Sequence, residues 1–243
     1  MSAPAFDATT LLVLARAAGL VARAPGFSHP SVPPIVRAGL ALALACAVAP
    51  AVAPVRGADL AELVLALAAN AATGAAIGFG ASLLYDGAYF AGRTVDDYLG
   101  VRGSVPGANV TSAQAFGRLW SSVFLVAFVL LDGWVPVVRA FAGSFAHVGA
   151  TGFPSSASWR AFALDVPAAI VRAAFEVAAP AIAVAAALQL ALAAVARVVP
   201  RFSSLSIAFP AVFAAALAVT LATLPLLARA GAHPWLVVPW SLR

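Results

Sequence analysis

Long stretches without charge constrain this chain more than any other feature. A helix of about 20 apolar residues crosses the hydrocarbon core of a bilayer, which is ~30 Å thick. Four segments reach that length without an Asp, Glu, Lys or Arg: Leu63–Tyr85, Ala140–Trp159, Val177–Ala196 and Phe202–Ala228. Hydrophobic residues make up 63% of the chain, and its mean hydropathy is +1.01. The sequence therefore predicts an all-α integral membrane protein.

The few charged side chains exclude several classes of function. Only 9% of the residues are charged, and the basic ones are all arginines, scattered near segment ends as side chains that snorkel to the interface would be. No basic run indicates nucleic-acid binding. The absence of lysine excludes a P-loop, and His29, His147 and His233 lie in unrelated segments without a second metal ligand nearby. We therefore expect no enzyme activity, metal or cofactor.

Prolines and glycines divide the chain into about six or seven hydrophobic helical segments, several of them kinked or broken. Asp7 is placed to cap a first helix that ends before Pro25-Gly26. A second helix is expected from Ile35 to about Ala53. A third is expected from Asp59 to about Gly92, which is longer than one straight span needs.

The second half of the chain is more interrupted. A polar stretch over 92–114 precedes a fourth span at 115–131, which Asp132-Gly133 should break, and 134–147 is too short for a simple span. The pattern from 159 to 199 is helical, but Pro167 and Pro180 are expected to break or kink it. A last span covers 205–229. No polar stretch is long enough for a soluble domain, so residues 1–243 are expected to form a single polytopic domain.

Three glycines form a small-residue face on the expected third helix. Gly74 and Gly78 are four residues apart, and Gly80 extends the pattern. In membranes such faces allow helix backbones to approach closely. The motif predicts tight helix packing without identifying the partner helix.

The order of these local patterns resembles the FliR/SctT family (SpaR/YscT-like), a membrane component of the export gate in flagellar and virulence-type type III secretion. The resemblance covers nearly the whole chain, and its glycine-rich part is Gly74–Phe79. The other positions that carry it are Pro25, Pro33, Arg37, Gly92, Asp96, Gly100, Pro180, Arg197, Pro200 and Pro210. Four positions depart from the family pattern, which often has acidic residues at the first two: Asn70, Gln189, Arg201 and Val212. The departures indicate a divergent member of the family, of either the virulence-type or the flagellar branch.

The resemblance implies a specific assembly. Family members join FliP/SctR-like and FliQ/SctS-like subunits around an export channel for unfolded proteins in the bacterial inner membrane, next to an FlhB/SctU-like switch protein. Their subunits are kinked helical hairpins in a larger helical assembly. The uncharged part of the loop after Arg102, which comprises Gly103, Ser104, Val105, Pro106 and Gly107, then either faces the channel as part of its plug or is a plain solvent loop. Rival interpretations are a small-solute transporter, or a membrane subunit of one, and a membrane scaffold without a conduit.

Overall fold

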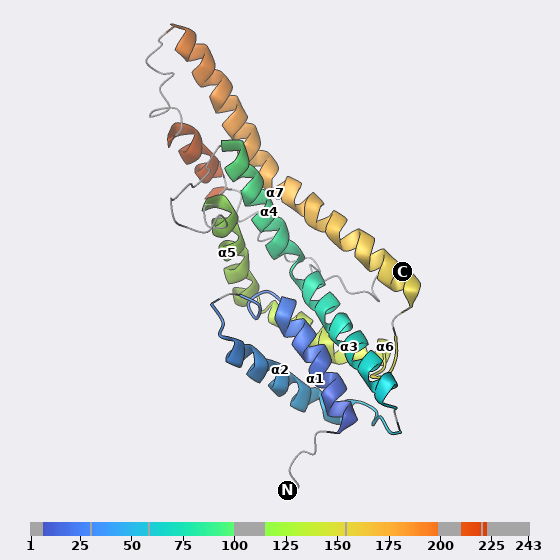
Figure 1. Cartoon of the computed structure of the whole chain (residues 1–243). Helices are drawn as coiled ribbons and strands as arrows, with labels where there is room; N and C mark the ends of the chain where they lie inside the picture. The colour runs from blue at the N-terminus through green and yellow to red at the C-terminus, as the bar shows by residue number, and fades with distance from the viewer. Residues whose placement is uncertain are drawn as a thin grey trace, which may run out of the picture. The chain divides into compact units, whose positions relative to one another are not determined.

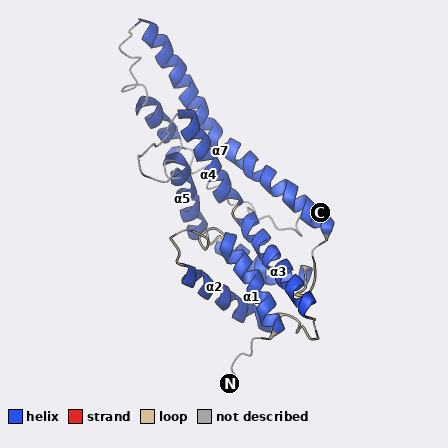
Figure 2. Cartoon of the chain, in the orientation of Figure 1, coloured by secondary structure: helices blue, strands red, loops and turns tan. Residues whose placement is uncertain are grey.

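The computed structural model describes residues 7–29, 31–57, 59–99, 115–153, 155–198, 210–219 and 221–222, and Figure 1 shows its helices. Within these residues the regular structure is entirely helical (Figure 2). The chain divides into two compact units. Unit 1 contains Met1–Leu83 and Phe128–Pro167, and unit 2 contains Leu84–Ala127 and Ala168–Pro234. The helices confirm the all-α membrane fold. The single-domain organisation stays a prediction.

The first two helices begin and end where the sequence predicts. Helix α1 spans Ala8–Arg23, and the Asp7 carboxylate accepts a hydrogen bond of 2.9 Å from the Thr10 N–H at its start. Helix α2 spans Pro34–Val48 and continues as a single 3-10 turn, η1, over Ala49–Ala51.

The third helix is shorter than expected. Helix α3 (Leu60–Ala81) begins in a capping box formed by Asp59 and Glu62. It ends at Ser82, whose N–H donates to the Gly78 carbonyl and whose hydroxyl donates to the Phe79 carbonyl at 2.9 Å. The prediction of one helix continuing to about Gly92 is therefore wrong, because Ser82 satisfies the last carbonyls of α3. Helix α4 (Leu83–Leu99) then runs into the stretch that we expected to be a polar loop.

The break after the fourth segment is confirmed. Helix α5 (Ala115–Leu130) and helix α6 (Trp134–His147) are separated by a turn in which the Gly133 N–H donates to the Phe128 carbonyl at 2.7 Å. Asp132 has a φ of 52°, in the left-handed region that Asp adopts more readily than most residues. This residue ends the first helix of the pair.

Helix α7 (Ser156–Val198) extends for 43 residues. Pro167 and Pro180 lie inside it, so the chain is not broken at these residues, and a kink there stays a prediction. A proline costs a membrane helix only a local hydrogen bond that neighbouring groups can replace. Within the described part of the chain, three helical segments are long and apolar enough to span a bilayer: Pro34–Ala51, Leu60–Ala81 and Ser156–Val198. The bent pair α5 and α6 makes a fourth if it crosses as one span, and a shorter apolar helix covers Pro210–Val219.

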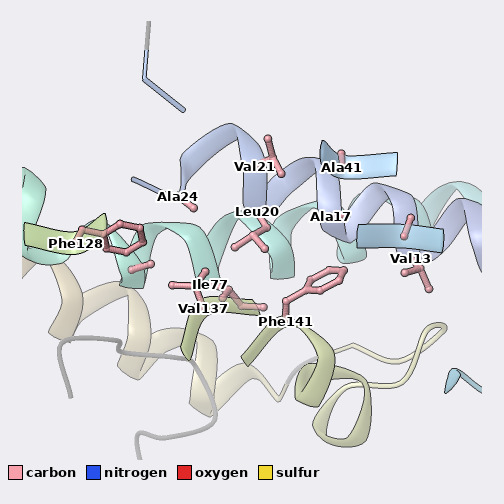
Figure 3. Packing of buried hydrophobic residues seen from close by; sticks show 12 residues of the cluster. Val13, Ala17, Leu20, Val21, Ala24, Ala41, Ile77, Phe128, Val137 and Phe141 are labelled. Atoms are coloured by element: carbon pink, nitrogen blue, oxygen red, sulfur yellow. The ribbon is translucent and has the colours of Figure 1, made fainter. Parts of the chain in front are cut away.

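The core of unit 1 forms where α1 packs against α3, α2 and α6 (Figure 3). Ala17 and Leu20 of α1 meet Ile77 of α3 and Phe141 of α6, and all four side chains are fully buried. In unit 2, alanines of α4 and α7 pack around Phe116 and other aromatic residues of α5. Small side chains in both cores let the helix backbones approach closely.

Candidate functional site

Glycines bring α1 and α3 into backbone contact. A Cβ at Gly74 would collide with the carbonyl oxygen of Arg16, and one at Gly78 would lie 2.8 Å from that of Leu20. From the other side, a Cβ at Gly19 would collide with the Ala71 carbonyl. Gly80, which also belongs to α3, is buried. These contacts leave no room for a side chain along the crossing of α1 and α3.

Beside this crossing lies a buried arginine that the sequence interpretation missed. Arg16 is 0% exposed, and its Nε donates to Asn70 Oδ1 of α3 at 2.9 Å. One terminal nitrogen donates to Ser144 Oγ of α6 at 2.8 Å. The other donates to the carbonyls of Val148 at 3.0 Å and Gly149 at 3.3 Å. We call this group, with Phe145, the Arg16 cluster.

The Arg16 cluster stabilises its cation without a carboxylate among the described residues. The Phe145 ring lies 3.9 Å from the guanidinium carbon, close enough for a cation–π contact. The Val148 and Gly149 carbonyls follow the C-terminus of α6, where the helix dipole favours positive charge. Arg16 therefore joins α1, α3 and the end of α6 through one charged group.

Arg16 corrects our expectation that the arginines lie near segment ends or snorkel to the interface. Arg23, which is seven residues further along α1, does reach the surface and lies 4.9 Å from the centre of the Phe79 ring. The sequence signal was available, because a lone arginine in the middle of an apolar helix indicates a functional or structural site by default. The missing information was its partners, which are 54 to 133 residues away in the chain.

The second buried charge is Asp96 of α4, which is 1% exposed. Its two carboxylate oxygens accept hydrogen bonds of 3.1 Å from the N–H groups of Phe116 and Gly117, in the first turn of α5. One turn earlier, a Cβ at Gly92 would collide with the same Phe116 and Gly117 backbone. We call these four residues the Asp96 clamp.

The electrostatics of the Asp96 clamp combine two opposing effects. Burial raises the pKa of the Asp96 carboxyl above its ordinary value, while the hydrogen bonds from the Phe116 and Gly117 N–H groups oppose that rise. The N-terminus of α5 carries the positive end of a helix dipole, which favours a carboxylate. The clamp can hold the start of α5 on α4.

Other positions of the family pattern lie in turns and at helix ends. Pro25 follows the end of α1, and Pro33 directly precedes α2. Arg37 donates from Nε to the Val32 carbonyl at 3.1 Å and from a terminal nitrogen to the His29 carbonyl at 2.7 Å, which fixes the turn before α2.

The remaining positions belong to unit 2 or lie outside the described residues. Pro180 lies inside α7, Arg197 lies in its last turn, and Pro210 begins the short helix after it. Gly100, Pro200 and the proposed plug residues 103–107 lie outside the described residues.

The departures from the family pattern fall in different environments. Asn70 is a member of the Arg16 cluster. Gln189 accepts a hydrogen bond of 3.2 Å from the Tyr98 hydroxyl, and Val212 is buried. Arg201 lies outside the described residues. Asn70 is thus the departure with a clear structural consequence, since it gives Arg16 a neutral acceptor.

Comparison with known proteins identifies one relationship. The model of the family described as bacterial export proteins, family 1, matches residues 8–235. A comparison with curated proteins gives no match. The family match includes both the Arg16 cluster and the Asp96 clamp.

Proposed function

The chain belongs to family 1 of the bacterial export proteins, and on this premise we propose that it is a non-enzymatic core subunit of a type III secretion export gate. In this role it helps to form and close the channel through which unfolded proteins cross the bacterial inner membrane. The family match over residues 8–235 is the observation that carries the proposal. Three or four membrane-span candidates are compatible with a multi-pass protein.

The proposed partners are FliP/SctR-like and FliQ/SctS-like subunits, with an FlhB/SctU-like switch protein beside them. Large exposed apolar side chains support a role in assembly: Ile35 of α2 is 79% exposed, and Leu190 of α7 is 73% exposed. Apolar surface of this kind needs either lipid or protein to cover it.

The proposal is tested by co-expressing the chain with FliP-like and FliQ-like proteins encoded beside its gene and weighing the product by native mass spectrometry. One defined complex containing all three proteins is expected. A chain that stays monodisperse alone, while its neighbours assemble without it, would contradict the proposal.

The Asp96 clamp supports the plug hypothesis. The clamp fixes the last turns of α4 to the first turn of α5, which are the two helices that flank residues 100–114. The clamp thus holds together the two helix ends between which the proposed plug residues lie in the sequence. Deleting residues 105–109 should raise the ion leak through the assembled gate, and unchanged conductance would refute the hypothesis.

The transporter alternative predicted a polar cluster at mid-membrane depth. The Arg16 cluster is polar and buried, but its hydrogen bonds are made within the protein. A solute would have to displace these bonds, and buried donors left without acceptors cost about 1–3 kcal/mol each. The cluster therefore supports a structural role over solute binding.

A further inference from the structure

A groove of about 770 Å³ lies in unit 1 between the end of α2 and the end of α6. Its walls are mostly small apolar side chains, with Val48 and Val52 on one side and Ala142 and Phe145 on the other. Arg56 is the charged residue among the described residues that line it, and no acidic residue is among them. The groove is within the size range of small-molecule sites.

One wall of the groove is the turn that follows α6. The carbonyl groups of this turn face the Arg16 and Asn70 side chains. The Val148 and Gly149 carbonyls accept from Arg16, and the Ala150 carbonyl accepts from Asn70 Nδ2 at 2.7 Å. In a planar trans peptide the next N–H points opposite to the carbonyl, and the described chain contains no cis peptide. The N–H groups of residues 149, 150 and 151 therefore point away from the Arg16 and Asn70 side chains.

These three N–H groups have no acceptor in the described part of the chain. Gly149, Ala150 and Thr151 all line the groove. Successive main-chain N–H groups that point the same way form a concavity that binds anions. The Thr151 hydroxyl and the Arg56 guanidinium on the same groove add two further donors, so the donors favour a phosphate or another oxyanion.

The groove lies where membrane-scale segments end. One span candidate ends at Ala51 and the next begins at Leu60, so Arg56 belongs to the connection between two spans. Arginines at such positions lie at the level of the lipid headgroups. From there the apolar walls follow α2 and α6, along which an acyl chain can lie.

We propose that this groove binds one anionic phospholipid. Its phosphate accepts hydrogen bonds from the N–H groups of Gly149, Ala150 and Thr151 and pairs with Arg56. An acyl chain packs between α2 and α6 against Phe145. The lipid would therefore bind the N–H groups of the same turn whose carbonyl groups bind Arg16.

The test is native mass spectrometry of the full chain titrated with phosphatidylglycerol. One tightly bound lipid is expected, and Arg56→Gln should weaken its binding about fivefold, the effect of one arginine near an anionic surface. Ala150→Pro removes a single N–H donor at the second position of the Gly149–Gly152 turn, where proline is favoured, and should also weaken binding. Arg139→Gln, on the exposed surface of α6 and outside the groove, is the matched control.

Two further ligands identify what the groove recognises. Diacylglycerol lacks the phosphate, so binding as tight as that of phosphatidylglycerol would overturn the role of the N–H groups and Arg56. Inorganic phosphate lacks the acyl chains, so equally tight and Arg56-dependent binding of phosphate alone would overturn the assignment to a lipid. Equal lipid binding by the wild type, Arg56→Gln and Ala150→Pro would also refute the proposal.

Discussion

Among the described residues, units 1 and 2 each bury one charge against the end of a helix, with opposite signs. In unit 1 the Arg16 cation faces the last carbonyls of α6, and in unit 2 the Asp96 carboxylate faces the first N–H groups of α5. Both arrangements complement the helix dipole. They differ in the number of helices that they join, since Arg16 joins three helices whereas Asp96 joins two.

The buried side chains of the Arg16 cluster and of the start of α5 also differ in how completely their hydrogen bonds are satisfied. Asn70 and Ser144 of the Arg16 cluster hydrogen-bond both to Arg16 and to carbonyls. In unit 2 the indole N–H of Trp120, one turn after the Asp96 clamp, is buried without a partner in the described structure. An orphaned donor costs about 1–3 kcal/mol. We infer that the Arg16 cluster is a scaffold of unit 1, whereas the start of α5 in unit 2 keeps a buried side-chain donor without a partner among the described residues.

The largest effect is expected from removing the cation of unit 1. Arg16→Leu leaves the Asn70 and Ser144 side chains and two carbonyls with fewer partners, which should lower the free energy of unfolding by about 3–5 kcal/mol. The measurement is thermal unfolding in detergent together with the amount of protein in the membrane. Arg139→Leu removes an exposed arginine of α6 and should change neither the unfolding temperature nor the amount of protein in the membrane. An Arg16→Leu chain as stable as this control would contradict the scaffold role.

A smaller loss is expected at the crossing of α1 and α3. The Cβ introduced by Gly74→Ala meets backbone atoms of Arg16 and Leu20, which cannot rotate away, so the unfolding free energy should fall by about 1–3 kcal/mol. Gly143→Ala on α6 is the matched control, since no atom lies within 4 Å of its new Cβ. The free energy of unfolding of this control should rise by about 0.5–1 kcal/mol, because alanine has a higher helix propensity than glycine. Equal responses of the two variants would show that the close approach is unnecessary.

Unit 2 should respond locally to loss of the Asp96 charge. Asp96→Asn keeps one acceptor oxygen but releases one of the two N–H groups at the start of α5, with an expected local cost of about 1–2 kcal/mol. Hydrogen exchange should become about tenfold faster at Phe116 and Gly117, while the core of unit 1 stays protected. Asp97→Asn changes the exposed neighbouring carboxylate and serves as the control. Faster exchange throughout unit 1 would refute the separation of the two units.

The exposed cap of α1 should give the smallest effect, and it depends on pH. The Thr10 N–H, with help from its hydroxyl, holds the pKa of Asp7 below its ordinary value of 3.8. A lowered folded-state pKa stabilises the protein above pH 3.8, and this stabilisation is lost as the pH falls through the folded-state value. The melting temperatures of the wild type and Asp7→Ala should therefore converge on acidification. A constant difference between pH 7 and pH 3 would contradict this cap.

The fold was predictable from the sequence where one residue ends or begins a helix by itself. Asp7 and Asp132-Gly133 act within one turn of the chain, and both boundaries were predicted correctly. Prediction failed where distant contacts decide the outcome. Helix α4 continues to Leu99 because Val95 and Asp96 are buried on one face, while Arg93 and Asp97 remain exposed on the other.

The candidate site was predictable only as separate positions. Gly92 and Asp96 were singled out by family resemblance, but their common contact with the start of α5 comes from the fold. Arg16 was overlooked because none of its acceptors is a carboxylate. A neutral acceptor such as Ser144 Oγ or a main-chain carbonyl leaves no charge pattern in the sequence.

The most direct test of the contrast between the two units is the ion conductance of the assembled gate carrying Asp96→Asn. The complex with FliP-like and FliQ-like partners would be reconstituted in planar bilayers, with Asp97→Asn as the reference. Because the Asp96 clamp holds the helices on both sides of residues 100–114, the Asp96→Asn gate should assemble with normal stoichiometry and leak ions. Conductance equal to that of the reference, or failure to assemble, would contradict the account.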